Sequence, residues 1–182
     1  LTDPVSGKYI SAVGFQWAGK GAIKGIHERY PDMKLYQTEQ ECGDGKNDWS
    51  GAVYSWNLMR HYLDNGASAY MYWNISLDKG GISRWGWAQN SLVVVDLDTK
   101  TFHYTPEYYV MKHLSHYVQP GARKLETSGQ FSNLMAFVNP DKSIVVALAN
   151  EGNEDRQVSV EIDGRVYQPV LPAHSIATLL ID

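Results

Sequence analysis

YISAVGFQWAGKGAIKGIHERYPDMKLYQT, residues Tyr9–Thr38, predicts a strand, a helix and a second strand in direct succession. The first segment, Tyr9–Trp17, is apolar and aromatic, which is typical of a strand. Two glycines follow this strand. The next segment, Ala22–Tyr30, places apolar side chains at the spacing of one helix face, and a proline ends this helix. The apolar segment Met33–Thr38 then predicts the second strand.

The following segments repeat this alternation. A helix is expected up to Asp64, with either Asp48 or Ser50 as its cap, and Ala67–Ile75 predicts a third strand. Strands and helices that alternate at this spacing indicate a parallel sheet, in which functional side chains collect where the strands end. The three strand ends carry Gln16-Trp17, Thr38-Glu39 and Trp73-Asn74.

The rest of the chain is richer in β-structure. Leu92–Leu97 and Thr101–Tyr104 predict a hairpin, and Pro106 opens a helix that runs to about Tyr117. From residue 119 onward, short apolar runs separated by turn residues predict an antiparallel β-sandwich. These runs are Leu134–Val138, Ile144–Ala149, Gln157–Ile162, Val166–Val170 and Ile176–Ile181, with a strong hairpin signal at Asp163-Gly164. We therefore expect two domains, residues 1–118 and 119–182.

Composition excludes several classes of function. The 182 residues carry a net charge of −4, which disfavours a nucleic-acid binder, and no apolar stretch is long enough to span a membrane. The single cysteine, Cys42, excludes an internal disulfide. All six tryptophans lie between Trp17 and Trp87. Such clustering fits a carbohydrate site, but composition alone favours an aromatic core or a protein interface.

The densest polar cluster at a strand end is Thr38–Gly43, which contains Glu39 and Glu41. Two carboxylates are the groups that cleave glycosidic bonds. Neighbouring positions on one strand cannot place a carboxylate on each side of a bond, so we expect one catalytic carboxylate here and its partner elsewhere. A solvated acidic loop, or a metal site that includes Asp44 and Asp48, is the alternative.

Several motifs, in this order along the chain, resemble glycoside hydrolase family 30, and the glucosylceramidase-like bacterial members in particular. They are GFQWAGKGAI, YQTEQECGDG, YMYWNISLD, WGWAQNSLVVVD and TPEYYVMKHLSHYVQPGA. The family includes glucosylceramidases, β-1,6-glucanases and xylanases, and it retains anomeric configuration through a covalent glycosyl-enzyme. The resemblance implies strands 6–8 of a (β/α)₈ barrel in residues 1–118, followed by the antiparallel β-sandwich.

The resemblance also implies a site. Glu39 takes the place of the family's nucleophile, Trp73 forms the floor of the sugar subsite, and Trp17 or Gln16 forms its rim. Asn74 follows Trp73 at the end of the third strand. The resemblance assigns no role to Glu41, for which three remain open, namely to orient Glu39, to bind a sugar hydroxyl or to lie in solvent, and we favour the supporting role. Trp85, Trp87 and Asn90 are expected to border the substrate cleft. No cofactor or metal is implied.

One departure from the family is large. The acid/base glutamate of the family lies in an Asn-Glu-Pro-like motif, which this chain lacks, and Asn153-Glu154 is followed by Asp155 in the predicted sandwich. We therefore expect the C-terminal part of a retaining β-glycosidase, inactive by itself and secreted or periplasmic in a bacterium. Its expected partners are a β-glucoside or related carbohydrate, and the missing barrel half or a second copy. The alternative is a non-catalytic carbohydrate-binding or structural remnant that self-associates.

Overall fold

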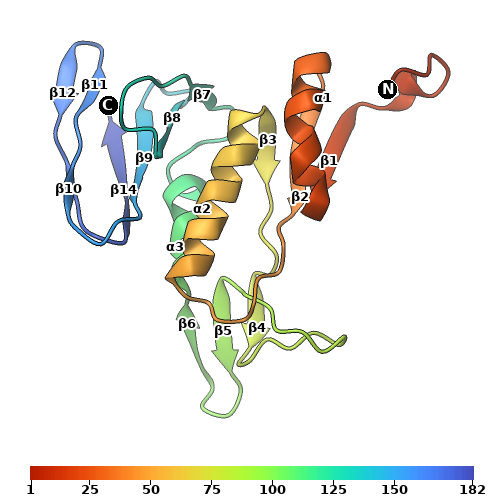
Figure 1. The fold of residues 1–182 in the computed structure, drawn as a ribbon, viewed down its shortest axis with the longest axis vertical. Helices are drawn as coiled ribbons and strands as arrows, with labels where there is room; N and C mark the ends of the chain where they lie inside the picture. The colour runs from red at the N-terminus through yellow and green to blue at the C-terminus, as the bar shows by residue number, and fades with distance from the viewer. The chain divides into compact units, whose positions relative to one another are not determined.

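In the computed structural model, which describes residues 1–182, three parallel strands lie side by side in the order β1-β2-β3 (Figure 1). They are β1 (Ala12–Gln16), β2 (Lys34–Glu39) and β3 (Ala67–Tyr70). The prediction of three mutually parallel neighbours is confirmed. The first strand is shorter than predicted, because the 3₁₀ helices η1 (Gly7–Tyr9) and η2 (Trp17–Ala22) take its two ends.

Two helices connect these strands, α1 (Ile23–Arg29) and α2 (Trp49–Asp64). Of the two candidate caps for α2, the structure selects Asp48, whose carboxylate accepts a hydrogen bond of 3.2 Å from the backbone N–H of Gly51. The helices and the sheet share one buried core. It is formed by Phe15, Ile23, Leu35, Leu58, Tyr62 and Ala67. Each large side chain buried there contributes about 1.5–3 kcal/mol.

The predicted third strand, Ala67–Ile75, is wrong in its length. After β3 the chain leaves the sheet and resumes as β4 (Ser76–Asp78), which pairs in parallel with β5 (Val93–Asp96). β5 also forms the predicted hairpin with β6 (Thr101–Tyr104). At this point the backbone N–H of Met71 donates to the side chain of Gln37, at 2.6 Å, while its carbonyl accepts from the N–H of Gln40 at 3.3 Å, so the regular ladder ends here.

The chain divides into two units, Leu1–Tyr108 and Tyr109–Asp182, so the division falls inside α3 (Pro106–Ser115), whereas the sequence places it after residue 118. The second unit contains an antiparallel sheet in the order β14-β9-β8-β7. Its strands are β7 (Arg123–Leu125), β8 (Leu134–Val138), β9 (Ile144–Asn150) and β14 (Ser175–Ile181). No helix of the chain has both the length and the apolar character of a membrane span.

Two short antiparallel ladders complete the second unit, β10 with β13 and β11 with β12. They comprise β10 (Arg156–Gln157), β11 (Val160–Ile162), β12 (Arg165–Tyr167) and β13 (Val170–Leu171). Each of the two apolar runs predicted here is therefore split into two strands. The predicted turn at Asp163-Gly164 is confirmed, since both residues have positive φ values, 50° and 77°, and join β11 to β12.

Candidate active site

Glu39 is the last residue of β2, where its half-buried carboxylate accepts a hydrogen bond of 2.7 Å from the indole N–H of Trp17. In the parallel pairing of β1 with β2, Gln16 lies opposite Glu39. Trp17 has a φ of 48°, a left-handed conformation that costs a non-glycine residue roughly 1–2 kcal/mol. Strain of this kind clusters at functional sites. Three predicted site residues therefore meet at the ends of two strands.

Glu41 lies two residues beyond Glu39 and is held on both of its oxygens. The Lys20 ammonium contacts Oε1, and the Tyr54 hydroxyl donates to Oε2 at 2.7 Å. Burial opposes ionisation of Glu41, but these two hydrogen bonds outweigh it and hold the pKa of the carboxyl below its usual range. The Glu41 contact in turn raises the pKa of Lys20. Glu41 is thus an anion, which can position neighbouring groups and has no proton to donate.

Backbone hydrogen bonds bring three predicted site segments together. The N–H of Asn90 donates to the carbonyl of Cys42 at 2.6 Å, and the N–H of Asn74 donates to the carbonyl of Asn90 at 3.5 Å. Earlier in the same two segments, the N–H of Gln40 donates to the carbonyl of Met71 at 3.3 Å. The chain segments that follow β2 and β3 therefore run beside each other and beside the loop that precedes β5.

The Asn90 side chain is buried, with 4% of its surface exposed. Its Oδ1 accepts from the N–H of Gly45 at 2.7 Å, and its Nδ2 donates to Oε1 of Glu107 at 2.6 Å. A side chain on Gly43, which has a φ of 74°, would collide with this amide. Asn90 therefore braces the loop after Glu41 against α3.

Sequence reasoning missed a buried amide network beneath Glu39. The Gln40 amide donates to the hydroxyl of Ser55 at 3.0 Å and accepts from the hydroxyl of Tyr70 at 2.5 Å. Gln37 is fully buried and holds Met71. The signal was the alternation of β2, which puts Gln37 on the same inward face as Leu35. A buried polar side chain at such a position needs partners, and here Oε1 of Gln37 has one in the N–H of Met71, whereas its Nε2 has none.

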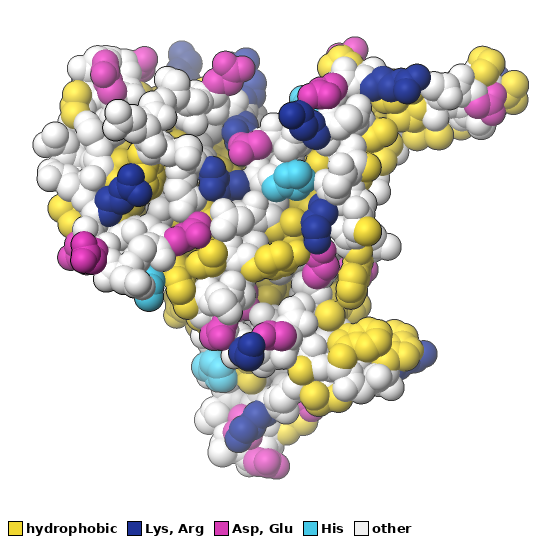
Figure 2. Space-filling view, viewed as in Figure 1, with side chains coloured by type: hydrophobic (Ala, Val, Ile, Leu, Met, Phe, Trp, Pro, Cys, Tyr) yellow, Lys and Arg dark blue, Asp and Glu magenta, His cyan; other side chains and the backbone are white.

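The other predicted aromatics are exposed. Trp85 and Trp87 stack with ring centroids 5.4 Å apart, and the Arg84 guanidinium lies 5.0 Å from the Trp85 ring centre. Figure 2 shows hydrophobic side chains gathered over the loop between β4 and β5 that carries this pair. Trp73 is 42% exposed. The prediction that Trp73 and Glu39 line one concavity stays a prediction.

A cavity of about 330 Å³ opens beside this cluster, and three predicted site residues line it. Its wall consists of Trp17, Gln40, Glu41, Cys42, Gly43, Asp44, Ser50, Gly51, Tyr54 and Asn90. The acids that the metal alternative requires are engaged elsewhere, because Asp44 pairs with Lys46 at 2.6 Å and Asp48 caps α2. The cavity therefore fits a polar organic ligand held by an indole and a phenol ring.

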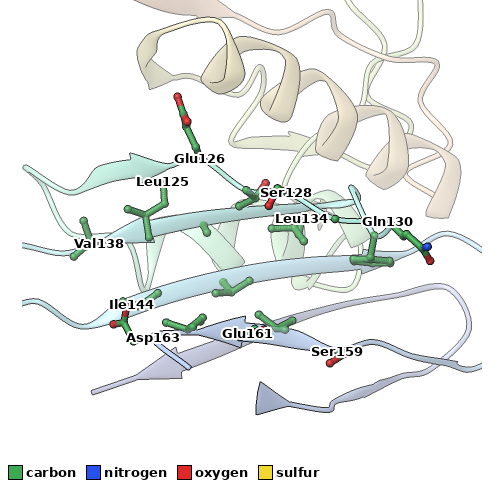
Figure 3. A pocket seen from close by; sticks show the side chains of 17 residues that line it. Leu125, Glu126, Ser128, Gln130, Leu134, Val138, Ile144, Ser159, Glu161 and Asp163 are labelled. Atoms are coloured by element: carbon green, nitrogen blue, oxygen red, sulfur yellow. The ribbon is translucent and has the colours of Figure 1, made fainter. Parts of the chain in front are cut away.

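Another cavity, of about 550 Å³, lies within the second unit (Figure 3). Aliphatic strand residues such as Leu134, Val138 and Ile144 line it, and Glu126 and Glu161 are among its few charged groups. None of the predicted site residues and no tryptophan or tyrosine lines this cavity. We therefore place the candidate site at the end of β2.

Glu107, the second residue of α3, is fully buried, and its Oε2 has no hydrogen-bonding partner. Burial raises the pKa of this carboxyl, and the hydrogen bond from Asn90 offsets only part of the effect. The folded-state pKa thus exceeds the unfolded one. Protonation of Glu107 stabilises the fold below the ordinary carboxyl range of about pH 4, and this contribution is lost as the pH rises through the folded-state pKa.

Glu107→Gln should therefore stabilise the protein at neutral pH, because the amide stays uncharged and still accepts from Asn90. We expect the melting temperature at pH 7.5 to rise by about 2–4 °C, the effect of about 1 kcal/mol in a chain of this size. The gain should shrink to nothing near pH 4 in thermal unfolding followed by circular dichroism. The matched control is Glu126→Gln, an exposed carboxylate, which should show no such pH dependence. Equal destabilisation by Glu107→Gln at every pH would contradict the prediction.

Comparison with known proteins identifies the second unit. Residues 121–179 match the Glycosyl hydrolase family 30 beta sandwich domain. The resemblance of the chain to glycoside hydrolase family 30 is therefore confirmed, and this segment is similar to the β-sandwich domain of that family.

Individual relatives match nearly the whole chain. The lysosomal acid glucosylceramidase of Mus musculus is 24% identical over 200 residues, which cover 99% of this chain and 38% of the mouse protein. The crystal structure of SrfJ from Salmonella typhimurium is 25% identical, with a TM-score of 0.86 over 98% of this chain and 42% of that one. The endo-beta1,6-glucanase BT3312 has the same fold, with a TM-score of 0.83 at 22% identity and the same coverage. The chain thus spans about two fifths of the length of these proteins.

Proposed function

We propose that the chain is the C-terminal part of a retaining β-glycoside hydrolase, with Glu39 as its nucleophile and a β-glucoside or related carbohydrate as its substrate. The observation that carries the proposal is the contact between Glu39 and Trp17 at the carboxyl end of a parallel sheet. Names of the relatives, a glucosylceramidase and an endo-β-1,6-glucanase, support a glycosidic substrate. A secreted or periplasmic location follows from the family resemblance alone. Strands β1–β3 would be strands 6–8 of the barrel.

In this proposal each oxygen of Glu39 has a separate role. The Trp17 indole holds Oε1, so Oε2 is the oxygen that attacks the anomeric carbon. The bond to the leaving oxygen breaks with its electron pair, and that oxygen takes a proton from a general acid. Water then gives a proton to the same group, which now acts as a base, and its oxygen attacks the anomeric carbon, so that the bond to Glu39 breaks and the carboxylate leaves. The indole hydrogen bond orients the Glu39 carboxylate before attack and stabilises it as it leaves the anomeric carbon afterwards.

A trapped intermediate tests this proposal. A 2-deoxy-2-fluoro-β-glucoside or xyloside with a dinitrophenolate leaving group should attach to the full-length protein that carries these residues. Mass spectrometry of the peptides should place the added sugar on Glu39, and Glu39→Gln should remove it. In Glu41→Gln the sugar should still attach to Glu39. A label on Glu41 in the unsubstituted protein, or on another residue, would overturn the assignment.

A non-catalytic carbohydrate-binding protein is the second candidate, because the exposed Trp85–Trp87 stack offers a flat aromatic face to a sugar ring. Glucan binding measured by calorimetry distinguishes the two. A binding module should bind the glucan and should gain no label from the fluorinated probe. Trp85→Ala should then abolish glucan binding.

A further inference from the structure

The 3₁₀ helix η2 contacts both carboxylates of the segment after β2. Its first residue, Trp17, donates to Glu39, and Lys20, one turn later, contacts Glu41. Since one short helix carries both donors, a displacement at one contact is transmitted to the other.

The contact at Glu41 joins three elements. Lys20 comes from η2, Glu41 from the chain after β2, and Tyr54 from α2. The Lys20 ammonium also lies 3.3 Å from the Tyr54 hydroxyl, so the three polar groups contact one another. The backbone carbonyl of Lys20 is 2.8 Å from Nε2 of His61, also on α2. The side chain of Glu41 is only 20% exposed, which makes the ion pair stronger than one on the open surface.

We propose that Lys20, Glu41 and Tyr54 form a positioning clamp, which holds η2 against the chain after β2 and so keeps the Trp17 indole on Glu39. The inference rests on the proposed role of Glu39 as nucleophile. The strained backbone of Trp17 supports it, because a left-handed tryptophan persists only where its surroundings impose that conformation. Trp17, at the first position of η2, needs such an anchor on the same helix.

The test uses Lys20→Met, Glu41→Gln and the double variant in the full-length protein, with the labelling rate of Glu39 as the measurement. Both single variants should label about 10- to 100-fold more slowly, because small misplacements at a reacting group have effects of this size. The double variant should label little more slowly than either single variant, because both changes remove the same contact. Lys20→Arg, which keeps the cation, should recover most of the rate.

A coupling measurement tests whether the clamp acts through Trp17. Trp17→Phe should slow labelling, and its combination with Glu41→Gln should slow it little further, because the second change removes a contact already lost. Tyr54→Phe, which deletes one oxygen, should slow labelling about 3- to 10-fold without unfolding the protein. The control is Lys24→Met, which removes an exposed ion pair with Glu28 on α1 and should change nothing.

Two outcomes overturn the clamp. The first is an unchanged labelling rate in Lys20→Met and Glu41→Gln, and the second is full additivity of Glu41→Gln with Trp17→Phe. Thermal unfolding identifies a variant that fails to fold, and Tyr54→Phe then decides. Failure of the unsubstituted protein to be labelled at Glu39 overturns the nucleophile instead, so the two failures are distinct.

Discussion

Glu39→Gly should lower glycosidase activity of the full-length protein on the order of 10⁴-fold or more, the scale of loss when a catalytic nucleophile is removed. Glu39 is half-buried at the strand end, and the one hydrogen bond that the structure gives its side chain is the one from Trp17. The core around Phe15 and Leu35 does not include it. The change should therefore remove the covalent step and leave the fold intact, which circular dichroism and thermal unfolding can check.

Azide distinguishes a lost nucleophile from a damaged site. In Glu39→Gly a small anion can enter the space of the carboxylate, attack the anomeric carbon of an activated aryl glycoside and expel the phenolate. The product should be a glycosyl azide of inverted configuration, which nuclear magnetic resonance identifies. Glu41→Gly serves as the matched control and should give no azide product. If azide rescued Glu41→Gly and did not rescue Glu39→Gly, the nucleophile would be Glu41 and the proposed assignment would be wrong.

The parallel sheet was predictable because its signals are local. Each strand is a short apolar run, each connecting helix has a periodic face, and the glycines and proline between them mark the ends. The rule that chemistry collects at strand ends then pointed to Trp17 and Glu39, which the structure joins by a hydrogen bond. The prediction for the residues after β3 was wrong, because the N–H of Met71 bonds to the side chain of Gln37 and the regular ladder ends there. The local pattern does not encode this contact.

The contacts around Glu41 show what a sequence leaves open. Lys20, Glu41 and Tyr54 lie on three elements, and no spacing rule relates them. The expectation that Asn90 borders the cleft stays a prediction, and its side-chain amide is hydrogen-bonded to Gly45 and Glu107. Long-range side-chain partners depend on packing, which local periodicity cannot supply.

The polypeptide of residues 1–182 should not hydrolyse unactivated β-glycosides, because no accessible acid near Glu39 is arranged to protonate the leaving oxygen. Glu41 is held as an anion by Lys20 and Tyr54. Hydrogen bonds likewise lower the pKa of Asp44 and of Asp48, from Lys46 in the first case and from Ser50 in the second. Glu107 has a raised pKa but is fully buried. A retaining enzyme needs its second carboxyl about 5–5.5 Å from the first.

General acid assistance contributes about 10²–10⁴-fold, so its absence should appear as a dependence on the leaving group. A dinitrophenyl fluoroglycoside needs no proton to depart and should label Glu39 in this polypeptide, while a disaccharide of the same sugar should stay intact by chromatography. Glu39→Gln is the control that should lose the label. Steady turnover of the disaccharide would contradict the prediction. A loss of this turnover in Glu41→Gln would then show that Glu41 supplies the acid, and a dependence of the rate on protein concentration would show that a second copy supplies it. The expected dependence on the leaving group follows from the contacts of Glu41. Lys20 and Tyr54 hold this carboxyl group ionised, so it has no proton to donate to the leaving oxygen.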